Sequence, residues 1–164
     1  MNLPSYRIVN LAQAFGSLLL ITIAVVYFER SLNLEPCYLC MLQRGVIIAI
    51  GVIGALAAVH NPQQFGQRVY SSLSITMVLI GVYFSGKQLW LQSLPDSQVP
   101  SCGIPVSNLF ENFSTIEAIT TLIRGDGNCA EVRWQLMGLS MPGWVMVCCV
   151  GFGAIGVIQF LRKS

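Results

Sequence analysis

Charged residues are scarce in this chain. They make up 10% of its 164 residues, while 54% are hydrophobic. Water-soluble domains carry about 25% charged residues, so the composition argues against a water-soluble globular protein. The formal net charge of +2 is small and scattered along the sequence. Nucleic-acid binding needs a concentrated basic face, and we therefore expect no nucleic-acid partner.

The hydrophobic residues fall in four long blocks rather than in short alternating or amphipathic patterns. About 20 apolar residues are enough for a helix to cross a ~30 Å hydrocarbon core. We therefore expect an all-α integral membrane protein, a four-transmembrane-helix bundle that forms a single domain over residues 1–164. No small-residue cleavage site follows the first block, so we interpret it as a retained span and not a signal peptide. The predicted spans are about 8–28, 41–59, 69–91 and 144–161.

Basic residues predict how the bundle is oriented, because cytoplasmic loops of membrane proteins are enriched in Lys and Arg. Four spans place both termini on one side. The short segments on that side are dense in basic residues, whereas the outer segments are much longer and hold only scattered arginines. We therefore expect cytoplasmic termini, with loops of about 29–40 and 92–143 on the outer side. The basic residues on the inner side are Arg7, Arg68, Arg162 and Lys163.

The second outer loop is far longer than most connections, and loops of such length are usually functional or disordered. Apolar residues recur in it at helical spacing, opposite a polar face. This pattern predicts a surface amphipathic helix, which either lies on the membrane or packs on the outer ends of the spans. The two placements are compatible. The apolar positions are Val106, Leu109, Phe110, Phe113, Ile116, Ile119, Leu122 and Ile123.

The six cysteines fall into three pairs by predicted depth. The first pair lies at the outer mouth of the second span, the next in the long outer loop, and the last inside the fourth span. The first two pairs share a compartment that oxidises thiols. We interpret the last pair as packing residues, because buried free cysteine behaves as a small hydrophobic side chain. In this order the pairs are Cys37 and Cys40, Cys102 and Cys129, and Cys148 and Cys149.

Cys37-Tyr-Leu-Cys40 is a C-x-x-C motif, in which the two thiols can close a small ring that opens reversibly. A structural disulfide gains little from so short a loop. It would suit Cys102 and Cys129 better, where closing the long loop stabilises the fold by roughly 3 kcal/mol. A zinc site needs four ligands, usually in two close pairs, and the only histidine, His60, lies on the opposite side. We therefore expect a redox role for the C-x-x-C pair and no metal site.

Arg44 follows Cys40 by one helical turn on the same face of the second span. Cys40 itself falls in the first turn, where free backbone N–H groups and the helix dipole stabilise a thiolate. One interpretation is that the Arg44 guanidinium binds the carbonyl oxygen of a lipid-soluble oxidant. The other is that the side chain merely extends to the outer surface. We expect the first.

The run Cys37-Tyr-Leu-Cys-Met-Leu-Gln-Arg44 resembles the C-x-L-C-x-x-x-R signature of the DsbB disulfide bond formation proteins. These are bacterial inner-membrane enzymes that reoxidise the periplasmic thiol oxidase DsbA. Further matches follow in family order and cover essentially the whole chain. They are Trp90-Leu-Gln-Ser-Leu-Pro, Val99-Pro-Ser-Cys102, Asn128-Cys-Ala-Glu-Val-Arg-Trp134 and Gly138-Leu-Ser-Met-Pro-Gly-Trp144.

The resemblance implies a quinone-dependent protein thiol-disulfide oxidoreductase of the inner membrane, with redox disulfides Cys37–Cys40 and Cys102–Cys129 in its periplasmic loops. Reduced DsbA, a thioredoxin-fold oxidase, would attack Cys102, and the freed Cys129 would exchange at Cys37. Cys40, with Arg44 beside it, would face ubiquinone or menaquinone in the membrane lipid. Some family members carry a histidine after the third span that is linked to the quinone. Residues 87–98 contain none. Lys87 and Gln88 are the candidates to replace it, but we assign neither, so the quinone-binding residues beyond Arg44 stay unassigned.

Two other classes of function remain open. A thiol reductase that moves electrons outward would need a cysteine pair deep in the membrane. Cys148 and Cys149 are deep, but adjacent residues on a helix point about 100° apart and pair poorly. A non-enzymatic assembly protein with a disulfide-stapled loop would instead keep Cys37 and Cys40 in one redox state.

Overall fold

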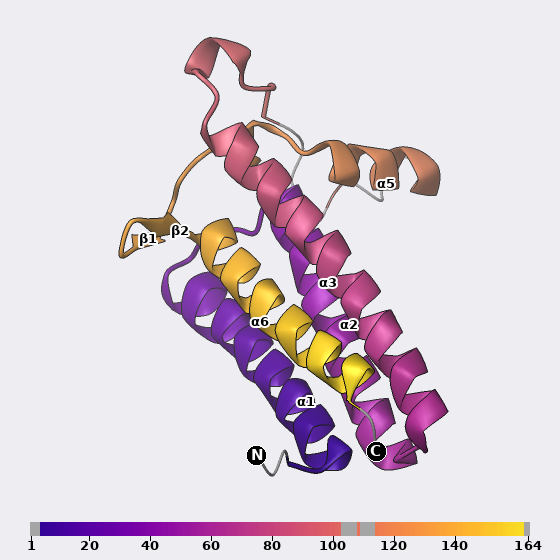
Figure 1. Ribbon diagram of the computed structural model, residues 1–164. Coiled ribbons are helices and arrows are strands. Elements are labelled where there is room, and N and C mark those ends of the chain that lie inside the picture. The colour runs from indigo at the N-terminus through magenta and orange to yellow at the C-terminus, as the bar shows by residue number, and fades with distance from the viewer. Residues whose placement is uncertain (1–3, 103–107, 109–113, 163–164) are drawn as a thin grey trace.

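A computed structural model describes residues 4–102, 108 and 114–162. In this part of the chain, four helices are long and apolar enough to cross a membrane. They run side by side, with both termini at the same end of the bundle (Figure 1). The predicted four-helix membrane bundle is thereby confirmed. The helices are α1 (Tyr6–Thr22), continued by the π-helical segment η1 (Ile23–Ser31), then α2 (Tyr38–His60), α3 (Gln64–Gln92) and α6 (Met141–Leu161).

Local sequence signals explain where α2 begins and ends. Pro36 precedes the helix and disfavours helical backbone at the residue before it. Cys37 is the N-cap of α2, in extended conformation, so that Cys40 lies in the first turn. At the other end Asn61 adopts a left-handed conformation with φ 42° and its N–H bonds the carbonyl of Ala57. Such a residue closes a helix, and the chain turns directly into α3.

Two buried clusters form the core of the bundle. The membrane cluster joins α2, α3 and α6, and small residues let these helices approach closely, as is common in membrane proteins. A Cβ atom at Gly81 would lie 2.8 Å from the Cys149 sulfur. The outer cluster joins the start of α2 and the end of α3 to the long loop. The membrane cluster contains Val46, Ile47, Ile50, Val78, Cys149 and Phe152, and the outer one Tyr38, Leu39, Leu91, Ala118, Leu122 and Cys129.

Buried polar side chains tie α1 to its neighbours in the half of the bundle nearer the termini. The Gln13 amide donates hydrogen bonds to the Ile50 carbonyl at 3.2 Å and to the Ser74 hydroxyl at 2.9 Å. The Asn10 amide donates to Gln67 at 3.3 Å. Lipid offers these side chains no hydrogen-bond partners, so the bonds that they make join one helix to another. These contacts therefore fix how α1, α2 and α3 face one another.

The loop between α3 and α6 folds over the outer end of the bundle. Helix α5 (Thr115–Arg124) begins with a capping box formed by Ser114 and Glu117. It buries Ala118 and Leu122 in the outer cluster and leaves Ile116 and Ile119 exposed. Packing on the spans is thus observed for this helix, while its contact with lipid stays a prediction. Residues Val106, Leu109, Phe110 and Phe113 of the predicted amphipathic stretch lie outside the described residues.

After α5 the chain returns to the bundle through a short helix and a hairpin. The 3-10 helix η3 (Gly127–Cys129) is followed by β1 (Gln135–Leu136) and β2 (Leu139–Ser140), which pair antiparallel. Met137 and Gly138 form the turn with φ 52° and 81°, as a two-residue hairpin of this hand requires. The Ser140 hydroxyl donates to Gln92 at 2.7 Å. This bond fastens the hairpin to the end of α3.

We expect Gln13→Leu to lower the free energy of unfolding by roughly 1 kcal/mol, because interhelical hydrogen bonds in membrane proteins contribute about 0.6–1.7 kcal/mol. Reversible unfolding in mixed micelles measures the change. Ser72→Ala is the matched control, since its hydroxyl bonds only the Arg68 carbonyl of its own helix. Equal stabilities of the Gln13 variant and the wild type would contradict this role for the polar contacts.

Candidate functional site

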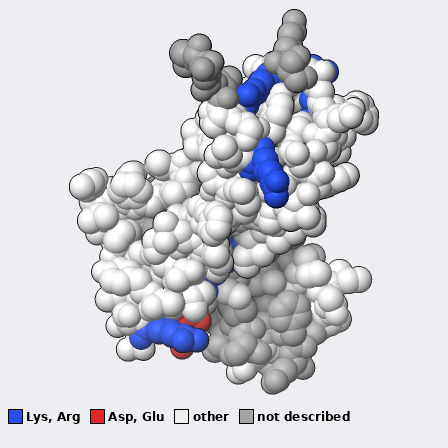
Figure 2. Space-filling model, turned by 90° about the horizontal axis from the view of Figure 1, so that it is seen from below, with Lys and Arg blue, Asp and Glu red and all other residues white. Residues whose placement is uncertain are grey.

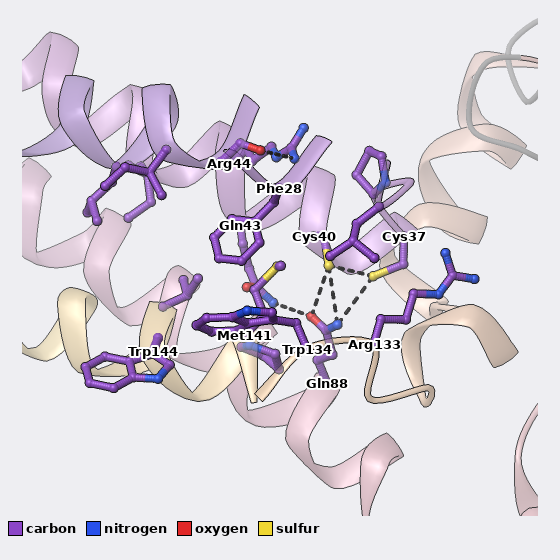
Figure 3. Close-up of a pocket in the computed structure, with 18 of the residues that line it drawn as sticks. Phe28, Cys37, Cys40, Gln43, Arg44, Gln88, Arg133, Trp134, Met141 and Trp144 are labelled. Atoms are coloured by element: carbon purple, nitrogen blue, oxygen red, sulfur yellow. Dashed lines mark hydrogen bonds between the residues drawn. The ribbon is translucent and has the colours of Figure 1, made fainter. Parts of the chain in front are cut away.

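The C-x-x-C cysteines lie where α2 meets the outer loop. Cys37 caps the helix and Cys40 lies in its first turn. The Cys37 thiol donates a hydrogen bond to the Cys40 sulfur, and the two sulfur atoms are 2.7 Å apart. Both side chains are partly buried and both line the same cavity. Figure 3 shows the two sulfur atoms side by side.

Gln88 of α3 reaches both sulfur atoms. Its amide nitrogen lies 3.3 Å from the Cys37 sulfur and 3.4 Å from the Cys40 sulfur. The Gln43 amide donates to the Gln88 carbonyl oxygen at 2.8 Å (Figure 3). The sequence alone does not single out Gln88, because its contact with the motif joins residues far apart in the chain. The signal available from the sequence was that Gln88 is a polar residue in an apolar span, and such residues are often functional.

Cys129 is fully buried, at 0% exposure, and lies in the cluster against which Cys37 packs. Hydrogen bonding from the Cys37 thiol lowers the pKa of the Cys129 thiol, and this effect exceeds that of burial, which acts in the opposite direction. The same bond, then the bond to Cys40 and burial, raise the pKa of Cys37. The Asp126 carboxylate, 3.3 Å from the Cys129 sulfur, opposes ionisation only weakly. Of the two thiols, Cys129 is therefore the one that ionises first.

Cys102 is exposed and lies against the segment that carries Cys129. The Gly127 N–H donates to the Ser101 carbonyl at 3.3 Å. A Cβ atom at Gly127 would lie 2.5 Å from the Pro100 carbonyl oxygen and 3.3 Å from the Cys102 sulfur, so only glycine permits this approach. Gly125, with φ 76°, ends α5 close to Leu39 and Leu91. Together the two glycines bring the loop cysteines down onto the outer end of α2.

A cavity of about 300 Å³ opens below Cys40 and is mostly apolar. Its walls come from α1, η1, α2, α3, α6 and the segment 128–134. The Phe28 and Trp134 rings meet edge to face at its outer side, with centroids 4.8 Å apart. Figure 3 shows that Met141 and Trp144 also lie beside the cavity. A flat, lipid-soluble molecule would find an apolar enclosure here, with Cys40 at its edge.

Arg44 lines this cavity and is held by two contacts with η1. Its guanidinium donates to the Glu29 carboxylate at 2.7 Å and to the Ala24 carbonyl at 3.3 Å. The Arg44 side chain is 20% exposed and that of Glu29 is 41% exposed. The π-helical form of η1, which is often found at functional sites, presents both partners to α2. Arg44 thus stands as a fixed cation on the cavity wall.

The two cysteines of α6 face different surroundings. Cys149 is buried in the membrane cluster against Gly81, which agrees with its interpretation as a packing residue. Cys148 instead lines the cavity together with Cys40. The interpretation of Cys148 as a packing residue therefore does not describe its whole environment. Because the two side chains point to opposite surroundings, they do not form the deep redox pair that an outward thiol reductase would need.

Comparison with known proteins decides the family. The model of the family described as "Disulfide bond formation protein DsbB" matches residues 6–159. The chain belongs to the DsbB family. A relative from Saccharophagus degradans, named disulfide bond formation protein B, is 44% identical over 99% of this chain and 97% of its own. A relative of the same name from Nitrosococcus oceani is 43% identical over 84% of this chain and 82% of its own. Another from Stutzerimonas stutzeri is 36% identical over the full length of both chains.

We expect Cys37→Ala to move the reactivity of Cys129 to higher pH. Without the donor the pKa of Cys129 rises toward the ordinary thiol value of about 8.5, so less thiolate is present at neutral pH. Alkylation of the reduced protein by a small haloacetamide, followed for each cysteine by mass spectrometry across a pH series, measures the midpoint. Cys148→Ala should leave it in place. An unchanged midpoint in Cys37→Ala would rule out this source of ionisation.

Proposed function

We propose that this DsbB family member is a quinone-dependent thiol oxidase that reoxidises a periplasmic thioredoxin-fold oxidase of the DsbA type. One observation carries the proposal. The cysteines form a series from water to the membrane cavity: Cys102 is exposed, its segment contacts that of Cys129, Cys37 packs on the cluster that holds Cys129, and the Cys37 thiol hydrogen-bonds Cys40 at the cavity.

The first step would be attack on the Cys102–Cys129 disulfide. A thiolate of the partner bonds the exposed Cys102 sulfur, the disulfide breaks, and the electron pair leaves on Cys129. The partner's second thiolate then displaces Cys102, which leaves the partner oxidised and the loop pair reduced by two electrons. Cys129 is suited to leave, because backbone hydrogen bonds from Asp126 and Leu39 stabilise the departing thiolate and well-stabilised thiolates are good leaving groups.

The second step would transfer the electrons to the C-x-x-C pair. The Cys129 thiolate attacks the Cys37 sulfur of a Cys37–Cys40 disulfide, and the electron pair of the broken bond leaves on Cys40. Attack by Cys102 on Cys129 restores the loop disulfide, which leaves Cys37 and Cys40 reduced. The contact between Cys129 and Cys37 means that this exchange needs little rearrangement.

The residues of the cavity fit a quinone. The volume of about 300 Å³ and the apolar lining suit a ring from ubiquinone or menaquinone, and such pockets carry only a few polar groups. Arg44 would hold a carbonyl oxygen and stabilise negative charge on it, while Cys40 supplies the electrons. A bound quinone would accept two electrons and two protons. Phe28 and Trp134 would exclude water from the site.

The proposed orientation places the cysteines in the periplasm of the inner membrane and both termini in the cytoplasm. Both termini lie at the end opposite the cysteine-bearing loops (Figure 1). Seen from below, the visible face is mostly uncharged, with basic side chains at a few separate places and acidic ones beside one of these only (Figure 2). An excess of Lys and Arg marks the cytoplasmic side of membrane proteins. The single domain of residues 1–164, with spans of about 8–28, 41–59, 69–91 and 144–161, is part of the same proposal.

We expect Cys40→Ser to lower quinone reduction by at least about a hundredfold, because the hydroxyl is a far poorer nucleophile than a thiolate. Purified protein in lipid discs, supplied with a reduced DsbA-type oxidase and ubiquinone or menaquinone, gives the rate from quinone absorbance. Cys149→Ser, which alters a cysteine of the membrane cluster outside the cavity lining, should retain turnover. Absence of turnover in the wild type with either quinone would favour a non-enzymatic assembly role.

We expect Arg44→Gln to raise the KM for quinone about tenfold, because hydrogen bonds to charged groups contribute roughly 1.5–3 kcal/mol. Arg124→Gln is the control, since Arg124 lies at the end of α5 and does not line the cavity. The same assay with varied quinone concentration separates KM from kcat. If Arg44 only extends toward the surface, both variants will keep the wild-type KM.

A further inference from the structure

Two buried carboxamides lie beside the C-x-x-C cysteines. Gln43 of α2 and Gln88 of α3 are each 3% exposed. Their amides form a chain in which Gln43 donates to Gln88 at 2.8 Å and Gln88 contacts both sulfur atoms. Polar side chains within membrane spans are costly and are commonly functional. The position of this pair at the redox site calls for a role beyond joining two helices.

The Gln43 amide fixes the direction in which Gln88 points. It occupies the Gln88 carbonyl oxygen, so the Gln88 amide nitrogen is turned toward the cysteines (Figure 3). A carboxamide nitrogen carries two hydrogens. With distances of 3.3 Å to Cys37 and 3.4 Å to Cys40, one N–H is available for each sulfur.

The same carboxamide can serve Cys40 in both protonation states. The Gln88 carbonyl oxygen lies 3.7 Å from the Cys40 sulfur and accepts from its thiol. A Cys40 thiolate has no hydrogen to donate and would instead take the N–H at 3.4 Å. Donors fixed in place before charge develops stabilise that charge strongly where water is excluded.

We propose that Gln88 is a catalytic hydrogen-bond donor to Cys40 and that Gln43 is the residue that positions it. The inference rests on the thiol exchange of the proposed function. In that exchange the Cys129–Cys37 bond forms, the Cys37–Cys40 bond breaks, and the electron pair stays on the Cys40 sulfur. No proton moves. The N–H of Gln88 faces the atom on which the negative charge appears.

Arg44 is less suited to this task. Its guanidinium donates to Glu29 at 2.7 Å and to Ala24 at 3.3 Å and has further N–H groups for an oxidant, but no hydrogen bond from it to either sulfur is among those of the described residues. Gln88 supplies a donor without placing a further charge in the membrane. The two residues thus divide the site, with Gln88 acting on sulfur and Arg44 on the oxidant.

The test is the reduction potential of the Cys37–Cys40 pair in protein stripped of quinone and held in lipid discs. After equilibration in glutathione buffers, free thiols are trapped and assigned by mass spectrometry. Gln88→Leu, similar in size, should make the pair about tenfold harder to reduce, given the strength of hydrogen bonds to charged groups. A tenfold change corresponds to about 30 mV. Alkylation of Cys40 in the reduced protein at neutral pH should slow by a similar factor.

Further variants separate donation from packing. Gln88→Glu keeps the size but replaces the donor by an acceptor, so its potential should fall at least as far as that of Gln88→Leu. Gln43→Leu leaves the Gln88 amide in place but removes the bond that orients it, so we expect a smaller change, about threefold in the equilibrium constant for reduction. This variant provides the test if the Gln88 variants do not fold. Gln159→Leu, a buried glutamine near the end of α6, is the matched control and should keep the wild-type potential.

The outcomes distinguish this inference from the proposed function. A wild-type potential and a wild-type Cys40 alkylation rate in Gln88→Leu would overturn the inference, even if the protein reduces quinone. The expected shifts in a protein that reduces no quinone would leave the donor role standing and overturn only the proposed acceptor. A shift of equal size in Gln159→Leu would show a general effect of buried glutamines and also overturn the inference.

Discussion

Inside a membrane, lipid offers polar groups no hydrogen-bond partners, so the bonds that they make lie within the protein. This constraint shapes the bundle at two depths. Near the termini, Gln13 bonds α2 and α3 and fixes how the helices face one another. Near the outer end, Gln43 donates to Gln88, and Gln88 reaches the cysteines. At the outer end, the hydrogen bonds that satisfy polar side chains within the bundle therefore also position an amide beside the redox cysteines.

The sequence could predict the helices because each span is a long, predominantly apolar block, and hydropathy needs no knowledge of neighbours. It could also single out the C-x-x-C motif and Arg44, because both lie within one short run on a single helix. The resemblance to the DsbB family, now confirmed, supplied the roles of Cys102 and Cys129. The assignment of those roles to individual residues stays a prediction.

The remaining parts of the site depend on contacts between distant segments, which spacing cannot reveal. Gln88 meets Cys40 only because α3 packs beside α2, and the lack of a histidine in residues 87–98 gave no hint of an amide at the sulfur atoms. Cys148 faces the cavity while Cys149 faces the core, a difference set by the rotation of α6. The segment of Cys102 can approach that of Cys129 because Gly127 has no side chain to collide with Pro100. This contact joins distant residues, so the sequence does not reveal it.

Burial of Cys129 has a consequence for the fidelity of electron flow. Glutathione and other small thiols in the surrounding water can touch Cys102, but the second sulfur of the loop pair is enclosed at 0% exposure. In the proposed series of exchanges, the steps after Cys102 are therefore kinetically insulated from soluble reductants. Soluble thiols would therefore exchange only at Cys102, and the later sulfur atoms would lose few electrons to side reactions. Selectivity would then arise from access to one sulfur atom rather than from a difference in potential.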